Sequence, residues 1–186
     1  FMDSLDNGRE LAQSIVRVAN AAGTKTKAVL TDMNQVLGRN VGNALEVLEA
    51  VDYLKGENID SRMHRITLRL CAELLVLSGL AVTADEATAK LQKKLDSGAA
   101  LEIFAQMVHA LGGPADFCER PQHYLPKAAV VRPVYAKREG YVSTIQTRNI
   151  GLSIIELKGG RITPEQKLDY ALSLIHISEP TRQAEI

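Results

Sequence analysis

The chain has 186 residues, of which 46% are hydrophobic and 24% are charged. This composition is typical of a folded globular protein and excludes disordered and collagen-like chains. Twenty-two basic residues are balanced by 22 acidic ones, so the basic surplus typical of nucleic-acid-binding proteins is missing. No apolar run approaches the ~20 residues that cross a bilayer. We therefore expect neither a nucleic acid nor a membrane as a partner.

The two cysteines, Cys71 and Cys118, are too few for a disulfide framework or a zinc cluster. A reducing, cytoplasmic compartment is the expected location. The histidines His64, His109 and His123 have no metal-ligand spacing to one another or to a cysteine. Cys71 falls on an apolar helix face, where a cysteine is more often part of the core than a nucleophile. No serine lies in a nucleophile elbow, so we expect no catalytic residue from these side chains.

Hydrophobic periodicity predicts a helix over residues 8–22 that ends at Gly23. Residues 26–32 form a short apolar run with β-branched residues, which indicates a buried strand. A further helix is expected after Asn43, which can cap it, and Gly56 should end that helix. A helix, a short turn and a buried strand together favour an α/β fold with a parallel sheet and flanking helices.

Three more helices are expected before residue 112. The first begins at Asp60 and ends at Gly79. The second begins with the capping box formed by Thr83 and Glu86 and continues to Leu95. The third covers residues 99–111, whose expected inward-facing positions are Leu101, Phe104, Met107, Val108 and Leu111.

The pattern changes after residue 127. Strands are predicted at residues 128–135, 141–145 and 153–157, and a helix should start at the Thr163-Pro164 pair. We therefore divide the chain into a first domain over 1–115, a linker over 116–127 and a second domain over 128–171.

Both ends of the chain have unusual sequences. Phe1 precedes Met2, which suggests that the chain continues a longer protein. Residues 172–182 resemble the in-frame translation of a sequencing-library adapter. We therefore expect 172–186 to be an adapter-derived tail that packs poorly on the rest. The alternative is a genuine strand followed by a polar tail.

The loop 37–43 is the best candidate for a binding site. Gly38 and Gly42 let its backbone fold tightly, with carbonyl groups turned inward. Glu49 lies on the helix that follows and could complete an oxygen-lined cation site with those carbonyls. The alternative is a plain loop with Glu49 in solvent. Asp32 stands at the carboxyl end of the expected strand, where a turn or cap role is favoured over catalysis.

Several ordered segments resemble the thymidine and pyrimidine-nucleoside phosphorylases. The longest runs from Leu30 to Val47, and it is followed by Leu125-Pro126-Lys127-Ala128. Gly140-Tyr141-Val142 and Gly159-Gly160-Arg161 continue the series. The order and spacing match from Phe1 to about Ala171, so the resemblance covers nearly the whole chain outside the tail.

This resemblance implies a pentosyltransferase of pyrimidine salvage. Members of the family are homodimers that cleave a pyrimidine nucleoside with inorganic phosphate, and they need no organic cofactor. Residues 1–115 would be the C-terminal part of the family's α/β domain, with its parallel sheet and flanking helices. Residues from 128 would begin a truncated α/β hammerhead domain. The related anthranilate phosphoribosyltransferases lack a hammerhead domain, so the expected strands argue against them.

The resemblance also assigns site residues. Phe1 matches a phenylalanine that lines the pyrimidine pocket. Leu37 and Asn40, through their carbonyl groups, and Glu49, through its carboxylate, match positions that coordinate a potassium ion. The family's phosphate- and base-holding residues would precede Phe1, so we expect no catalytic residue in this chain and no phosphorolysis by it alone.

Three functional interpretations remain open. The first is thymidine phosphorolysis, and the second is a broader pyrimidine-nucleoside phosphorylase that also accepts uridine. The third is a non-catalytic structural or binding fragment. A lipoyl-type carrier is disfavoured within that class because no lysine stands at the turn formed by Arg138, Glu139 and Gly140.

Overall fold

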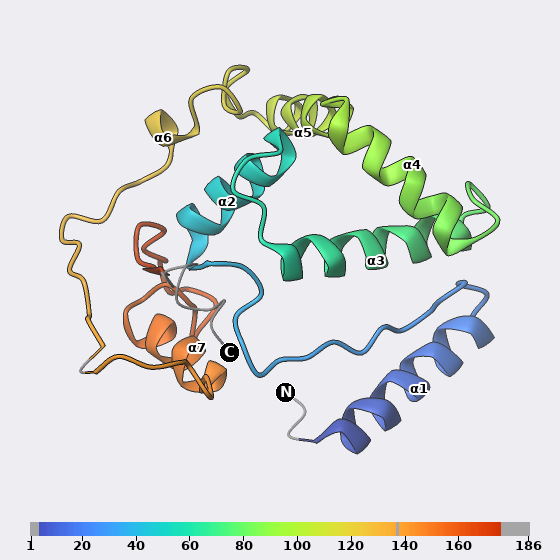
Figure 1. Cartoon of the computed structure of the whole chain (residues 1–186), viewed down its shortest axis with the longest axis horizontal. Coiled ribbons are helices and arrows are strands. Elements are labelled where there is room, and N and C mark those ends of the chain that lie inside the picture. The colour runs from blue at the N-terminus through green and yellow to red at the C-terminus, as the bar shows by residue number, and fades with distance from the viewer. Residues whose placement is uncertain (1–3, 137, 176–186) are drawn as a thin grey trace.

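The computed structural model describes residues 4–136 and 138–175. Within these residues the chain forms seven helices and one small sheet (Figure 1). The elements in chain order are α1 (Leu5–Ala21), β1 (Asn40–Val41), α2 (Asn43–Lys55), α3 (Ser61–Leu77), α4 (Ala84–Asp96), α5 (Ala99–Ala110), α6 (Pro121–Tyr124), α7 (Thr147–Glu156) and β2 (Leu174–Ile175). Helices α2 to α5 follow one another in an arc, and α1 stands apart from them.

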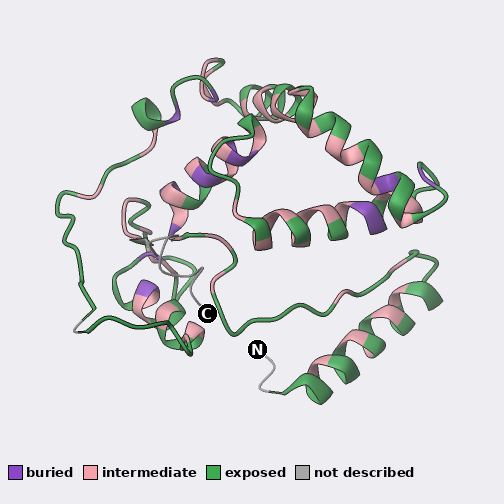
Figure 2. Ribbon diagram, in the orientation of Figure 1, coloured by how far each residue is buried: buried purple, intermediate pink, exposed green. Residues whose placement is uncertain are grey.

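The best-packed region lies between α3 and α4. Ala72, Ala81 and Ala87 are buried there, and larger side chains of the two helices surround them. The alanine side chain is a single methyl group, so the backbones of the two helices can approach closely. A second buried region lies along α2, where Val51 is fully buried and Tyr53 is nearly so. Figure 2 shows that most of the remaining ribbon is exposed or half-buried.

Most predicted helix boundaries are confirmed. The carboxylate of Asp60 accepts hydrogen bonds from the first amides of α3, and Thr83 accepts one from the amide of Glu86. The Glu86 carboxylate in turn accepts from the amide of Val82, which completes the cap of α4. Gly56 ends α2 with a φ of 80°, a left-handed conformation that glycine adopts without strain.

The expected cap of α2 was wrong by one residue. The helix begins at Asn43, and its N-cap is Gly42. The carboxylate of Glu46 accepts a hydrogen bond from the Gly42 amide at 2.8 Å. The Asn43 side chain is then free to donate to the carbonyl of Gly159 at 3.0 Å.

The predicted strand over 26–32 was wrong, because the segment forms no sheet. In the part of the chain that the structure describes, no main-chain hydrogen bond involves residues 27–31. A strand depends on pairing with a neighbouring strand, and no described segment forms a ladder with this one. Helix α1 is also exposed to solvent. It has no buried residue, and the side chains of Ile15 and Val18 are more than half exposed.

The strands predicted in the second half were also wrong. Residues 128–135 and 141–145 form no ladder, and 153–157 fall largely within α7. The segment at Thr163 forms only a turn, in which the Gln166 amide donates to the Thr163 carbonyl. Apolar runs of five residues fit either a helix or a strand, and no paired strand is present here to decide for the sheet.

The expected parallel sheet is not found among the described residues. The single sheet in those residues is antiparallel, and it pairs Asn40 with Ile175 and Val41 with Leu174. A genuine strand at the start of the tail is the sequence-based alternative to an adapter, and β2 at residues 174–175 agrees with that alternative. Residues 176–186 lie outside the described residues, and the adapter origin of the tail stays a prediction.

The C-terminal part of the described chain contacts the loop that precedes α2. The Thr147 hydroxyl donates to the carbonyl of Met33 at 2.6 Å, and the Ala44 amide donates to the carbonyl of Tyr170 at 3.1 Å. Gly42 has a φ of 138°, and a Cβ there would lie 2.5 Å from the Leu172 carbonyl oxygen. Only glycine therefore permits this close approach of the two backbones.

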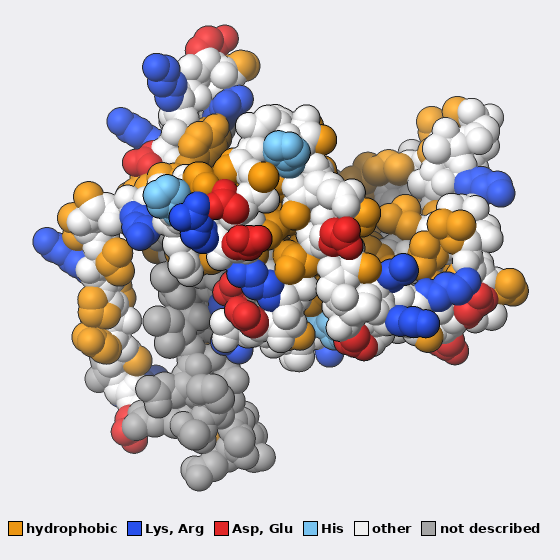
Figure 3. All heavy atoms as spheres, turned by 90° about the horizontal axis from the view of Figure 1, so that it is seen from above, with side chains coloured by type: hydrophobic (Ala, Val, Ile, Leu, Met, Phe, Trp, Pro, Cys, Tyr) orange, Lys and Arg blue, Asp and Glu red, His pale blue; other side chains and the backbone are white. Residues whose placement is uncertain are grey.

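The surface carries many apolar side chains. Seen from above, hydrophobic and charged side chains alternate over the face of the molecule in Figure 3. In the extended connection between α6 and α7, Val134 is 98% exposed and Tyr135 is 83% exposed.

No helix among the described residues is long and apolar enough to cross a membrane.

Candidate functional site

The loop between residues 32 and 42 is closed by the carboxylate of Glu49. This side chain comes from the second turn of α2 and is buried. Its oxygens accept hydrogen bonds from the amide of Arg39 at 2.8 Å and from the amide of Asn40 at 3.1 Å. The side-chain amide of Asn40 donates a third, at 3.1 Å. The alternative of a solvated Glu49 is therefore wrong.

Gly38 makes this arrangement possible. A Cβ at this position would lie 2.5 Å from Oε1 of Glu49 and 2.8 Å from its Cδ. Such distances are shorter than any relaxed contact, so a larger residue would push the carboxylate away. The tight loop that the two glycines predict is thus present, and its amides rather than its carbonyls face the carboxylate.

The carbonyl oxygens of the loop face a positive charge, the guanidinium of Arg62. Arg62, the second residue of α3, donates from Nη1 to the carbonyl of Val36 at 3.0 Å and more weakly to that of Leu37 at 3.4 Å. Its Nη2 donates to the carbonyl of Asp32. One guanidinium therefore gathers three carbonyl oxygens of a single loop.

The predicted site residues are brought together in part. Asn40 and Glu49 are hydrogen-bonded to each other, whereas the Leu37 carbonyl is directed at Arg62. Phe1 lies outside the described residues. Among the residues described, no group of three or more His, Cys, Asp or Glu side chains is arranged to hold a metal.

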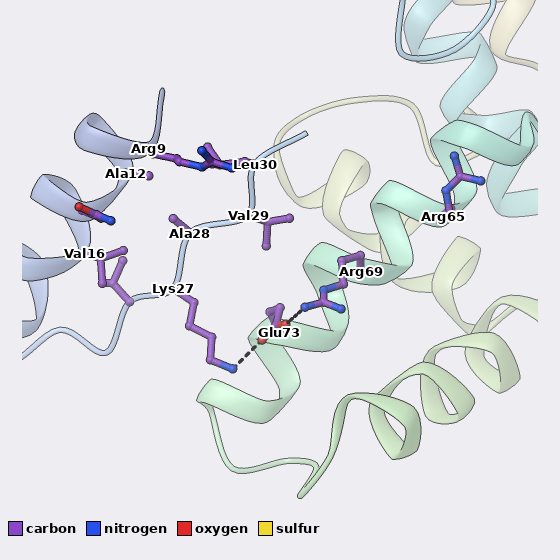
Figure 4. Close-up of a pocket in the computed structure, with 12 residues that line it drawn as sticks. Arg9, Ala12, Val16, Lys27, Ala28, Val29, Leu30, Arg65, Arg69 and Glu73 are labelled. Carbon is purple, nitrogen blue, oxygen red and sulfur yellow. Dashed lines mark hydrogen bonds and ion pairs between the residues drawn. The ribbon is translucent and has the colours of Figure 1, made fainter. Parts of the chain in front are cut away.

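A cavity of about 1020 Å³ lies between α1, the extended segment over residues 26–30 and α3. The residues around it are shown in Figure 4. They are Arg9, Ala12, Gln13 and Val16 of α1, residues 26–30, and Arg65, Arg69 and Glu73 of α3. Its walls are largely apolar, with four cationic side chains and one carboxylate. Three of the cations are already paired, Arg9 with Asp6 and both Lys27 and Arg69 with Glu73.

Glu73 links the extended segment to α3. Its oxygens accept from Nζ of Lys27 and from Nη2 of Arg69, each at 2.7 Å. The hydrogen bond from Lys27 and the two positive charges lower the pKa of the Glu73 carboxyl. Glu73 is therefore ionised at neutral pH and holds the two cations at the edge of the cavity.

The remaining candidates have structural roles. The Tyr53 hydroxyl and Nδ1 of His64 share a hydrogen bond of 3.0 Å between α2 and α3. Burial raises the pKa of Tyr53. Burial likewise raises the pKa of the Cys118 thiol, which makes it a poor nucleophile. Asp32 accepts from the amide of Asn34 at 2.8 Å and is a turn residue, as expected.

Comparison with known protein families identifies a matching family for the first half of the chain. Residues 1–101 match the glycosyl transferase family, a/b domain. The matched range includes the loop, Glu49, Arg62 and every residue that lines the cavity. The chain belongs to the glycosyl transferase family, a/b domain. It is therefore a member of a transferase superfamily, and the expected relation to glycosyltransferase-type domains is confirmed at this level.

Within this glycosyl transferase domain, sequence reasoning missed the cationic residues. Arg62, Arg65 and Arg69 are spaced three and four residues apart, so they share one face of α3. That spacing is a local signal in the sequence, whereas the prediction of this helix rests on its apolar positions alone. Lys27 gave no signal, because its partner Glu73 lies 46 residues away.

Proposed function

We propose that this glycosyl transferase domain belongs to a thymidine phosphorylase. The enzyme would transfer the 2-deoxyribosyl group of thymidine to inorganic phosphate and release thymine. Its substrates would be small molecules, a pyrimidine deoxynucleoside and phosphate, without an organic cofactor. The active form would be a homodimer in the cytoplasm, with neither a nucleic acid nor a membrane as partner.

One observation carries this proposal. The family match over 1–101 is continued by the phosphorylase-like segments at 125–128, 140–142 and 159–161. These segments lie beyond the matched domain, where the resemblance implies the start of a hammerhead domain. A transferase domain that continues in this way supports a nucleoside phosphorylase over an anthranilate phosphoribosyltransferase.

Glu49 favours the broader pyrimidine-nucleoside phosphorylase as a second candidate. We propose that this branch binds potassium through the carbonyls of Leu37 and Asn40 and the carboxylate of Glu49. The Glu49 carboxylate already accepts from the main-chain and side-chain amides of Asn40, which keeps it beside this residue. A carbonyl oxygen has two lone pairs, so the Leu37 oxygen can serve both a potassium ion and Arg62. The broader enzyme would cleave uridine as well.

A segment exchange tests the function. Residues 2–101 would replace the matching segment of an authentic thymidine phosphorylase, and thymine release from thymidine and phosphate would be measured. We expect the chimaera to keep phosphorolysis. A rate that depends on potassium, with that dependence lost in Glu49→Gln, would favour the second candidate. The same exchange into anthranilate phosphoribosyltransferase is the control and should abolish its activity.

A folded thymidine phosphorylase chimaera without turnover would contradict the proposal, as would an active control. The 186-residue chain by itself should release no thymine. Turnover by it near the rate of the intact enzyme would show that the phosphate- and base-holding groups are present in this chain.

A further inference from the structure

The segment between α1 and α3 is extended, yet the middle of its backbone has no partner. Among the residues that the structure describes, none forms a hydrogen bond with a main-chain group of residues 27–31. Main-chain amides and carbonyls are nearly always paired in a folded protein unless water reaches them. A row of such open groups is the hallmark of a sheet edge, which can pair with a strand of another chain. These five residues therefore offer a template for a second strand.

Both ends of this open stretch are held in place. The side-chain amide of Asn20 accepts from the Thr26 amide and donates to the Thr26 carbonyl, each at 3.1 Å. A neighbouring strand would bind both main-chain groups of a residue in the same way. At the other end, the Arg62 guanidinium donates to the Asp32 carbonyl. The segment is thus fixed between two anchors, so a partner strand has little left to order.

The side chains of the segment alternate between two helices. In Figure 4, Lys27 and Val29 point toward α3, whereas Ala28 and Leu30 point toward α1. Helices therefore flank both faces of the extended backbone, as they flank the strands of an α/β sheet. A second cavity, of about 310 Å³, is lined by residues 29–32 and adjoins the first. The two cavities together form a groove that follows the whole segment.

One charged side chain on the wall of this groove is unmatched. Arg65 lines both cavities, and its guanidinium forms no ion pair within the described part of the chain. Its neighbours Lys27 and Arg69 are both paired with Glu73. A carboxylate of a bound partner would give Arg65 the counter-charge that the chain itself does not supply.

We propose that residues 27–31 form the edge of an intermolecular sheet, and that the groove between α1 and α3 binds an extended segment of a partner protein. The partner adds one strand of about five residues, which spans about 17 Å at ~3.3 Å per residue. Because helices flank both faces, this strand is apolar on both faces instead of alternating, and it carries one Asp or Glu near Arg65. Main-chain hydrogen bonds supply the affinity and the side chains supply the specificity. The proposal is independent of the proposed phosphorolysis.

A second copy of this chain does not have the chemistry that the groove requires. The exposed segment 128–135 is largely apolar, but it carries Arg132 and no carboxylate. Residues 27–31 likewise carry Lys27 and no carboxylate. Either segment would bring another cation to a wall that already has an unmatched one. The partner is therefore a different polypeptide, and a synthetic peptide of residues 128–135 serves as a control.

Peptide selection on the immobilised 186-residue chain tests the proposal. Random heptapeptides displayed on phage would be selected, and the enriched peptides would be synthesised. We expect at least four consecutive apolar residues and one Asp or Glu in them. A bound peptide should slow the hydrogen exchange of the amides of residues 27–31 about tenfold or more. Methylation of its backbone nitrogens at one alternating set of residues should abolish binding, whereas methylation of the other set should not.

Variants of the chain separate the backbone from the charge. Val29→Pro and Leu30→Pro each remove one amide, from opposite edges of the segment, and at least one of them should abolish binding. Arg65→Ala should weaken binding about threefold and remove the preference for Asp or Glu. Arg17→Ala is the matched control, because Arg17 is exposed on α1 and lines neither cavity. It should bind the peptide as the unchanged chain does.

Selection that enriches no apolar peptide would overturn the proposal, and so would binding that leaves the exchange of residues 27–31 unchanged. Equal binding of the two methylated peptides would show that side chains alone make the contact. If the peptide of residues 128–135 binds as tightly as the selected ones, the partner is a second copy and the stated chemistry is wrong. The methylated peptides use the unchanged chain, so the test stands even if a proline variant does not fold.

Discussion

Glu73 is a carboxylate whose ionisation joins the extended segment to α3. It is nearly buried and accepts from both Lys27 and Arg69. Its lowered pKa means that the unfolded chain binds a proton at a higher pH than the folded chain does. The two ion pairs therefore stabilise the fold above the ordinary glutamate pKa of 4.5. This contribution is lost as the pH falls through the lower, folded pKa.

We expect Glu73→Gln to be less stable than the unchanged chain at pH 7, because the variant loses the negative charge between two cations. The difference should shrink as the pH falls below the ordinary glutamate pKa. Urea unfolding at several pH values measures both effects. Glu102→Gln is the control, since Glu102 is exposed and contacts only the Gln106 amide. A difference that stays constant with pH would show that the ion pairs do not contribute.

At the scale of single elements, the N-cap of α4 is the clearest case. Thr83 accepts from the Glu86 amide at 3.2 Å, and Glu86 closes the cap on the other side. We expect Thr83→Ala to lower the free energy of unfolding by about 1 kcal/mol, the usual cost of losing such a cap. Equilibrium urea unfolding, followed by circular dichroism, measures this change.

Thr88→Ala in the same helix is the matched control. The Thr88 hydroxyl donates within the helix to the Ala84 carbonyl, and alanine is the better helix former. Its stability should be equal to or slightly above that of the unchanged chain. An equal loss in both variants would show that threonine packing, and not capping, stabilises α4.

The sequence predicted the elements that depend on local signals. The caps at Asp60 and Thr83 and the stop at Gly56 involve residues at most four apart, so spacing alone reveals them. The apolar runs at 26–32 and 153–157 have no local signal that separates a strand from a helix. Their state is set by partners elsewhere in the chain.

In the candidate site, too, the sequence predicted the contact between residues that are close in the chain and missed the contact between distant ones. Glu49 was predicted beside its loop because the two are about ten residues apart and the loop leads directly into the helix that carries Glu49. Arg62 lies 25 to 30 residues from the carbonyls that it contacts. No periodicity relates such distant positions, so its place at the loop follows from the way α3 packs and not from the sequence pattern.

At the scale of the whole molecule, the connection between α6 and α7 is the exposed part. Chymotrypsin should cut this connection first at Tyr135, which is 83% exposed, whereas Tyr53, at 7%, should resist. The two pieces should stay together under native conditions. Hydrogen bonds join Met33 to Thr147 and Asn43 to Gly159, one from each side of the cut.

Size-exclusion chromatography before and after urea measures this association. The nicked protein should elute as one species in buffer and as two in urea. Tyr135→Ser removes the cleavage site and should slow the first cut. Pieces that separate in buffer would show that these long-range contacts are too weak to hold the C-terminal part in place.

The pairing of the loop with the C-terminal part also has a consequence for synthesis on the ribosome. The partners of Met33 and Asn43 lie 114 and 116 residues further along the chain. At about 5–20 residues per second, they emerge on the order of ten seconds later. During that interval the nascent loop has Glu49 and Arg62 as partners but lacks its C-terminal ones. Chaperones that bind nascent chains would meet the open segment 27–31 and the apolar face of α1 in this window.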